Sequence, residues 1–526
     1  MKTPFALTAT VAVALVPAGA AAVDTHSARP HKTLCVSSKR SCFHGLRAAL
    51  KSAKRGDTIR LAAGTFPGGA TVRVSVKIIG AGSAKTILSG GHPVLTIGVR
   101  GAMTEPTVSI AGVTITGGVQ TSIGAVSKGG GIEIPAAAGG STGATVTIRN
   151  SVITGNRHTP ATSAPLGPPC PGDRRCEFAG GFGGGIANAG TLTLIGVTVS
   201  DNLVGGALAS DAEGAGILSE RGNLTLRHSV VSGNHATAGE PNGRFADGGG
   251  IFLRSGRLTM KNSRVTDNVA ELTNAFPNSV ETLAVAGGVH VTEEATATIR
   301  GTTISGNSVS SVNSVGSAAA FSAGLHADGA VTLHDVTISG NRAAATTPSS
   351  SAADAFADSG AGEINGAAAI DNSRFTGNSV TATAPGGTAV ASAGAFVSAA
   401  NPRTTISNSL VSGNSVTATS TTGTVIVQGA GIVNLGLLTL QNSRVENNAG
   451  TATGPAGVAL GGGIWNGAFP GSPMLQLTLV GTRVTGNALS ASPGVTVLGG
   501  GLYTERPVTL RTSVISGNSP DQCYGC

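Results

Sequence analysis

Two acidic residues and two histidines beside short glycine-rich runs have side chains suited to acid–base chemistry. Glu213 precedes "GAGI" and Asp247 precedes "GGGI", while His290 and His326 follow related runs further along the chain. Two carboxylates roughly 5 Å apart are the arrangement that retaining glycosidases use. Carboxylates beside imidazoles could also transfer protons or hold a cation. Glu213 and Asp247 are therefore the candidate catalytic pair, and ordinary solvated loop ends are the competing interpretation.

A second set of residues follows the same glycine-rich runs by one position. The predicted outward column contains Glu133, Ala187, Leu218, Phe252, His290, His326, Ile364, Phe396, Val433, Trp465 and Tyr503. Aromatic faces suit sugar rings or a partner protein. Alternatively, the long variable corner of each repeat folds back and buries the column. The candidate binding residues are Phe252, His290, His326, Phe396, Trp465 and Tyr503.

A third candidate surface is basic. Arg227, Lys261, Arg300 and His334 fall in one column of successive repeats that Asp371 ends, and the chain has a net charge of +8. Such a stripe could attract a polyanion such as an acidic wall glycan. It could instead keep a flat sheet soluble and unpaired. Aromatic residues are not interleaved with these charges, so nucleic acid is not an expected partner.

A sequence repeat must position these residues. "SVVSGN" (229–234) has echoes throughout the chain, and their alignment brings together Asn156, Asn202, Asn234, Asn268, Asn307, Asn341, Asn378, Asn414, Asn448, Asn487 and Asn518. Spacings of 31 to 46 residues predict a solenoid with three short strands per coil and one corner of variable length. Each asparagine is expected at a corner, where its amide bonds the coils above and below and the preceding glycine permits the bend.

The repeats resemble those of the right-handed parallel β-helix of the pectin-lyase-like superfamily. More narrowly, the paired "GG[AG]I" and "Φ-x-x-N" elements are similar to repeats of polymorphic outer-membrane proteins, over roughly residues 129–518. The resemblance implies an all-β, single-stranded right-handed parallel β-helix of about a dozen coils. An amphipathic segment at 41–54 is expected to be an N-terminal capping helix. The resemblance implies no active site, because the "NTD", "DD" and "GHG" motifs of polygalacturonases and the Asp cluster of pectate lyases are missing.

The N-terminus has the features of a secretory signal peptide, with Lys2, an apolar run and the small residues "PAGAAA". The expected organisation is a signal peptide at 1–22, an N-terminal segment with the capping helix at 23–55, and the β-helix at 56–526. The rest of the sequence has no unbroken run of 18 apolar residues, so no membrane-spanning helix is expected. A C-terminal β-barrel of the autotransporter kind is not expected either. The mature chain is predicted to be secreted, either extracellular or associated with the cell envelope.

The six cysteines form three local pairs in the sequence: Cys35 with Cys42, Cys170 with Cys176, and Cys523 with Cys526. An oxidising compartment favours local disulfides, although 15 pairings are formally possible. A metal site at "CYGC" would lack a second ligand pair. The sequence therefore predicts no metal and no other cofactor.

Together these features favour a binding or structural, adhesin-like role at or outside the cell envelope, in contact with polysaccharide or another surface protein. The alternative is a polysaccharide lyase or glycoside hydrolase that acts on an acidic glycan through Glu213 and Asp247. Enzymatic activity is left open, with binding preferred. Outward Ser and Thr residues beside the asparagines could form an ice-binding array, but Arg and Leu interrupt the pattern.

Overall fold

The computed structural model describes residues 31–121, 128–159, 180–206, 209, 211–239, 245–274, 282–314, 316–347, 352–399, 403–468 and 475–526. The predicted signal peptide lies outside these ranges. Within the described residues, no helix has the length and apolar character to cross a bilayer.

Two of the three predicted local disulfides fall within the described residues, and both are confirmed. They join Cys35 to Cys42 and Cys523 to Cys526. Cys170 and Cys176, the third predicted pair, both lie outside the described residues. The disulfide between Cys170 and Cys176 therefore stays a prediction from the sequence.

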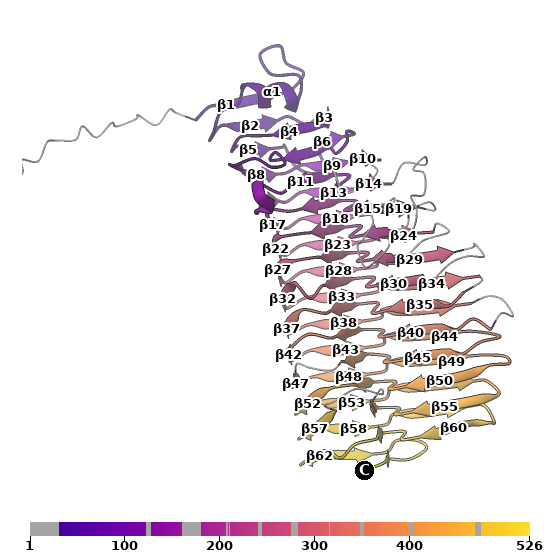
Figure 1. Ribbon diagram of the computed structural model, residues 1–526. Helices are drawn as coiled ribbons and strands as arrows, with labels where there is room; N and C mark the ends of the chain where they lie inside the picture. The colour runs from indigo at the N-terminus through magenta and orange to yellow at the C-terminus, as the bar shows by residue number, and fades with distance from the viewer. Residues whose placement is uncertain are drawn as a thin grey trace, which may run out of the picture.

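The chain winds into a stack of coils, and each strand pairs in parallel with its counterpart one coil later (Figure 1). One coil contains β16 (Ile186–Asn188), β17 (Thr191–Ile195), β18 (Thr198–Ser200), β19 (Leu203–Gly206) and β20 (Asp211–Glu213). In this order the strands belong to five sheets, which we number 1 to 5. Over the described ranges these sheets have 14, 15, 14, 11 and 10 strands.

Sheets 1, 2 and 3 enclose a tube whose interior is the main hydrophobic core. Leu192 and Leu194 of β17 point inward and are fully buried, whereas Thr191, Thr193 and Ile195 between and beside them are partly exposed. The same period-2 pattern recurs in other coils, and the inward side chains form one continuous apolar cluster along the stack. The predicted right-handed parallel β-helix is confirmed.

The repeat predicts three strands per coil, but many coils have two more, which form sheets 4 and 5. The variable corner forms strands of its own: sheet 4 leaves the tube and sheet 5 returns to it, so the two make a two-layered fin (Figure 1). Alanine and valine side chains from both sheets fill the space between them. The segment "SVTATAPGGTAVAS" (379–392) carries the signal, because alternating small residues let two sheets pack closely.

A short helix lies at the N-terminal end of the stack. Helix α1 (Leu46–Ser52) is shorter than the predicted amphipathic segment, and it contacts the first strands, namely β1 (Thr33–Val36), β2 (Thr58–Leu61) and β4 (Ala70–Val72). Leu46 and Ala49 on one face of the helix are buried. This apolar face is the one that the expected capping role requires.

The recurrent asparagines form a buried file along the corner between sheets 3 and 4. Nδ2 of Asn234 donates to Oδ1 of Asn268 in the next coil at 2.9 Å, and the backbone N–H of Asn234 donates to the same oxygen at 3.1 Å. Both bonds recur at every step of the file, at 2.8–3.1 Å. The left-handed backbone belongs to the preceding residue, such as Gly233 with φ 62°, and not to the asparagine itself.

Replacing Asn307 by Ala should lower the free energy of unfolding by about 2–4 kcal/mol, because two buried donors of Asn268 would lose their acceptor. Urea unfolding followed by circular dichroism measures this change. Ser305→Ala, two residues away on the partly exposed face, is the matched control and should change stability by less than about 0.5 kcal/mol. Equal effects of the two substitutions would show that the file does not stabilise the stack.

Candidate functional site

The predicted basic column lies on the outward face of sheet 2. Its strands are β22 (Gly222–Arg227), β27 (Gly256–Lys261), β32 (Ala295–Arg300) and β37 (Ala330–His334). Their register places Arg227, Lys261, Arg300 and His334 side by side. Adjacent strands are about 4.8 Å apart. The first three side chains are exposed, and none of them forms an ion pair with a described carboxylate.

The column extends toward the N-terminus further than the sequence predicts. The strands before β17 in sheet 2 are β12 (Thr145–Arg149), β8 (Thr107–Ala111) and β5 (Lys77–Ile79), which follow β2 at the end of the sheet. Their register continues the column of Arg227 through Ile195 to Arg149, and then through the uncharged Ala111 and Ile79 to Arg60. Both additional arginines are exposed. Arg149 stands seven residues before Asn156, as Arg227 stands before Asn234, so the repeat contains its position, but Ile195 interrupts the run of cations between them. Arg60 lies in a coil without the repeat signature, so alignment of repeats does not find it.

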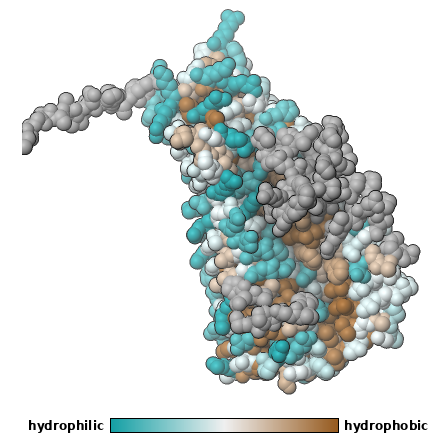
Figure 2. Space-filling view, in the orientation of Figure 1, coloured by the Kyte–Doolittle hydropathy of each residue, from teal (hydrophilic) through white to brown (hydrophobic). Residues whose placement is uncertain are grey.

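Positive charge is concentrated at the N-terminal end of the stack. Residues 31–100 contain twelve lysines and arginines, all exposed, and one acidic residue, Asp57. Asp57 is buried and accepts hydrogen bonds from the backbone N–H groups of Lys32 and Lys54. The excess of eleven positive charges in this segment is larger than the net +8 of the whole chain. Figure 2 shows hydrophilic residues over this end and down the edge formed by sheet 2.

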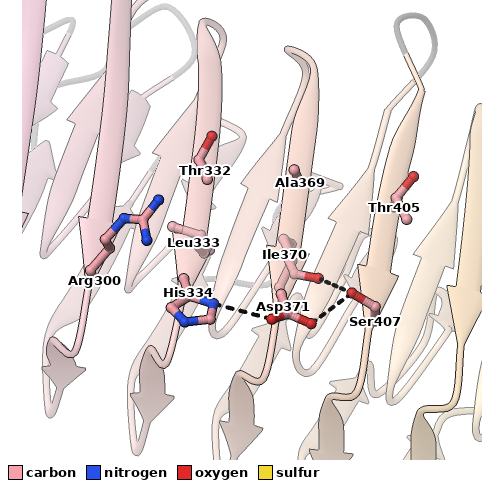
Figure 3. Close-up of a pocket in the computed structure, with 9 residues that line it drawn as sticks. All are labelled: Arg300, Thr332, Leu333, His334, Ala369, Ile370, Asp371, Thr405 and Ser407. Carbon is pink, nitrogen blue, oxygen red and sulfur yellow. Dashed lines mark hydrogen bonds and ion pairs between the residues drawn. The ribbon is translucent and has the colours of Figure 1, made fainter.

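A shallow depression in sheet 2 marks the other end of the basic column. It is lined by Arg300, Thr332, Leu333, His334, Ala369, Ile370, Asp371, Thr405 and Ser407 (Figure 3). Ala369 of β42 (Ala368–Asp371) occupies the position that Thr332 and Thr405 hold in the neighbouring strands. The smaller side chain therefore leaves a hollow in the surface.

Asp371 is the anion at the end of the column, as predicted. It lies beside His334 in the register, and His334 Nδ1 is 3.1 Å from its carboxylate. Asn408 Nδ2 and Ser407 Oγ each donate to Asp371 at 2.9 Å, and these bonds, with the charge of His334, lower the pKa of the carboxyl. Asp371 is therefore ionised at neutral pH, where it would repel a bound polyanion.

The two candidate catalytic carboxylates are neighbours in sheet 5. Strand β20 pairs with β25 (Phe245–Asp247), with Glu213 opposite Asp247. Each already has a cationic partner: Arg254 forms an ion pair with Glu213, and His290 Nδ1 lies 2.7 Å from Asp247. Burial raises the pKa of Glu213, while Arg254 opposes that rise. Both carboxylates thus face protein groups and not a space between them that a sugar could enter.

The two histidines lie on adjacent strands of sheet 1, β31 (Val289–Val291) and β36 (Leu325–Ala327). The rings of His290 and His326 are 4.7 Å apart and nearly perpendicular, at 82°. The carboxylate of Asp328 faces both: one oxygen is 3.4 Å from His290 Nε2, and the other is 3.3 Å from His326 Nε2. Burial lowers the pKa of His290, but Asp247 and Asp328 raise it to about 10. Burial opposes ionisation of Asp328, yet hydrogen bonds from both histidines lower its pKa.

Several charged residues beside these histidines are missed by the sequence analysis. They occupy the positions directly after strands of sheet 1: Glu220, Arg254 and Asp328. Arg254 donates to Glu220 at 2.6 Å, and Lys128 Nζ donates to the same carboxylate at 2.8 Å. The guanidinium of Arg254 also lies 5.6 Å from the centre of the Phe252 ring. These residues share one position of the repeat, directly after the strand that follows the glycine-rich run. Aligning that position across the repeats would have identified this network.

The predicted aromatic column lies in the angle between the tube and the fin. Trp465 of β56 (Ile464–Asn466) is 3% exposed and packs with Val433 and with Leu460 of β55 (Ala456–Leu460) in sheet 5. Phe252 is buried as well, whereas Tyr503 is half-buried and stacks on Tyr524. Figure 2 shows an apolar band in this angle. The interpretation in which the variable corner folds back over the column is therefore correct for most of its length.

The placement of Phe396 and Ile364 in that column is wrong. The register puts Glu363 and Val397 there instead. Phe396 points into the tube, is 1% exposed, and lies 5.9 Å from the ring of Phe375. It pairs with Gly362, which stands where other coils have a larger apolar residue, so the large and small side chains compensate. Phe396 is a core residue and not a binding residue.

Residues 104–300 match the family model "Right handed beta helix region". No curated protein sequence matches the chain. Among solved structures, the mannuronan C-5 epimerase AlgE6 A-module of Azotobacter vinelandii is similar at 15% identity and TM-score 0.26, over 89% of this chain and 92% of that one. An alginate lyase from Paenibacillus sp. str. FPU-7 is similar at 13% identity and TM-score 0.20, over 90% and 99%. At these values neither reaction transfers to this chain.

Asp247→Asn should reduce the pH dependence of stability that His290 contributes. An unfolded histidine has a pKa of about 6.5, whereas folded His290 has a pKa of about 10. Its protonated form therefore stabilises the fold fully below about pH 6.5, and this contribution is lost as the pH rises toward 10. Urea unfolding in EDTA-containing buffer should show a steeper loss of stability across this window for the wild type than for the variant.

The matched control for this measurement is Asp371→Asn, which removes a partner of His334 that is much more exposed than Asp247. Because exposed ion pairs contribute little, its curve should run parallel to that of the wild type. A parallel curve for Asp247→Asn as well would mean that Asp247 does not hold the proton on His290.

Proposed function

We propose that the protein is a secreted binding protein that holds an acidic polysaccharide along sheet 2. The observation that carries this proposal is the column of exposed cations, Arg227, Lys261 and Arg300, in register and without carboxylate partners among the described residues. The column points toward the strongly basic N-terminal end. A polymer with one negative charge per sugar would meet a positive charge at successive strands.

The neighbouring column of sheet 2 suits sugar hydroxyl groups. Thr225, Thr259 and Thr298 lie side by side, two residues before the three cations, and all are partly exposed. Each threonine hydroxyl can donate one hydrogen bond and accept others. Cations and hydroxyls would then contact the carboxylates and hydroxyls of the same chain of sugars. This two-column arrangement favours an acidic polysaccharide over a protein partner.

A purely solubilising role accounts for the basic column less well. A surface that only prevents association usually intersperses both signs of charge. Arg444 of β53 (Arg444–Glu446) on sheet 3 illustrates that case, since its guanidinium lies 4.0 Å from Glu446. The cations of sheet 2 are instead of one sign over three consecutive strands. Nucleic acid is a weaker candidate because aromatic residues do not alternate with these cations.

Turnover of the glycan is the alternative function, and the partners of the two candidate carboxylates speak against it. Glu213 is paired with Arg254 and Asp247 with His290, and only 14% and 11% of the acidic side chains are exposed. A glycosidase or lyase needs such groups to be directed at the substrate. Binding without cleavage is therefore the function that this geometry supports best.

The test compares two triple variants with the same change in net charge. Arg227→Gln/Lys261→Gln/Arg300→Gln should weaken binding to polygalacturonate or alginate about 3- to 150-fold, since each exposed charge contact contributes about 0.2–1 kcal/mol. Arg374→Gln/Arg444→Gln/Arg483→Gln alters exposed arginines of sheet 3 and should leave binding nearly unchanged. Calorimetry at two salt concentrations measures both, and added salt should weaken wild-type binding.

Equal losses in the two triple variants, or no loss in either, would contradict the proposed surface. Neutral glycan and double-stranded DNA of similar length are run in parallel, and stronger binding to DNA would replace the polysaccharide by a nucleic acid. Reducing ends and unsaturated-uronate absorbance are followed in the same samples. Turnover by the wild type that Glu213→Gln or Asp247→Asn abolishes would establish the enzymatic alternative.

A further inference from the structure

We propose that His290, His326 and Asp328 bind a divalent transition-metal ion of the zinc class in the angle between the tube and the fin. The three side chains offer one donor atom each, and these atoms lie within 4.8 Å of one another. They come from two adjacent coils, so parallel pairing of β31 and β36 brings them together. The site is distinct from the basic column, which lies on sheet 2.

The donor spacing fits a small cation. In a tetrahedral zinc site with ligands at about 2.0–2.2 Å, neighbouring donor atoms are about 3.4 Å apart. Asp328 oxygens are 3.4 Å from Nε2 of His290 and 3.3 Å from Nε2 of His326. Each histidine therefore directs the same nitrogen at one carboxylate, across the distance that a shared ion would span.

The second nitrogen of each ring is already engaged, which fixes the ring orientation. Nδ1 of His290 lies 2.7 Å from both carboxylate oxygens of Asp247. Nδ1 of His326 lies 2.9 Å from Ser322 Oγ and 3.5 Å from a Glu363 oxygen. A carboxylate or hydroxyl on the far nitrogen is the outer-shell arrangement that orients metal-binding histidines and strengthens their donor nitrogen.

The third ligand is held as well. Asn365 Nδ2 donates to Asp328 Oδ1 at 2.8 Å, and this bond restrains the carboxylate between the rings. Asp247 and Glu363 add negative charge around the site, which favours a dication once the histidines are neutral. Two imidazoles and one carboxylate suit zinc, cobalt or nickel, whereas calcium and magnesium prefer sets made only of oxygen.

The two histidine side chains are 10% and 12% exposed, but Asp328 is 34% exposed. The protein ligands thus lie on the inner side of the ion, and the outer side faces solvent through Asp328. Three protein ligands with a remaining open position are typical of zinc sites that bind water or a ligand molecule. The inferred ion would therefore be exchangeable and accessible to chelators.

The experiment titrates untagged, EDTA-stripped full-length protein with Co²⁺ and then displaces it with Zn²⁺. We expect visible absorption of four- or five-coordinate cobalt at one equivalent, lost on addition of zinc. Asp328→Asn and His326→Ala should each weaken Co²⁺ affinity at least tenfold. Asp247→Asn, which removes an outer partner of His290, should weaken it by about 10–100-fold.

The matched control is His334→Ala, which removes a histidine that also lies beside a carboxylate, at 3.1 Å from Asp371. Its Co²⁺ affinity should equal that of the wild type. Absence of the cobalt spectrum in folded wild-type protein would overturn the proposal. So would a spectrum that persists in Asp328→Asn, the substitution with the smallest change of shape. Circular dichroism of each protein establishes that it is folded, and the wild-type result decides the matter if a histidine variant does not fold.

Discussion

The hydrogen bonds of the buried asparagine file set the register on which every other feature of the molecule depends. A buried amide has to be paired, and here the partner of each asparagine is the asparagine of the next coil, such as Asn268 for Asn234. A slip of one residue would leave these amides unpaired and would turn each strand's apolar residues outward. One register therefore remains, and it converts positions in the repeat into continuous surface columns.

The columns differ in solvent exposure, and this difference decides which of them can contact a large ligand. Arg227 and Lys261 stand on the open face of sheet 2, where charges are free to meet a large ligand. Glu213 and Asp247 obey the same periodicity, but they stand at the end of sheet 5 where it meets the tube, and their charges are neutralised by Arg254 and His290. Equal spacing in sequence thus produces an exposed row of cations on one side and a compact polar cluster on the other.

The sequence predicts the fold, and it predicts the columns that lie close to the asparagines in the chain, because the number of residues between such a column and the asparagine hardly varies from coil to coil. The basic column of Arg227 is separated from the next asparagine by a short strand and a tight corner, and its prediction agrees with the register. Insertions fall in the fin, so the distance from an asparagine to the next strand of sheet 1 changes from coil to coil. Phe396 is misplaced for a different reason: Gly362 and Phe396 stand where neighbouring coils have Leu or Ile after the glycines, and their mutual compensation involves two coils and is invisible in one repeat. Arg149 stands seven residues before Asn156, as Arg227 stands before Asn234, so the repeat contains its position, but the uncharged Ile195 between them hides the continuation. Repeat alignment does not find Arg60, because its coil has neither the asparagine nor the glycine-rich motif.

The fin also explains why aromatic residues in the repeat do not form a sugar-stacking surface. An outward Trp465 on an isolated β-helix would present its face to solvent, but here Leu460 of sheet 5 packs with it. Covering this side buries apolar surface and shields the charged cluster further along the same angle, where lower dielectric strengthens each ionic contact. The fin therefore leaves the outward face of sheet 2 open to solvent while it encloses His290 and His326 beside Asp328. The same insertion that obscures the repeat in the sequence creates the only environment in this part of the described chain where two imidazoles and a carboxylate converge.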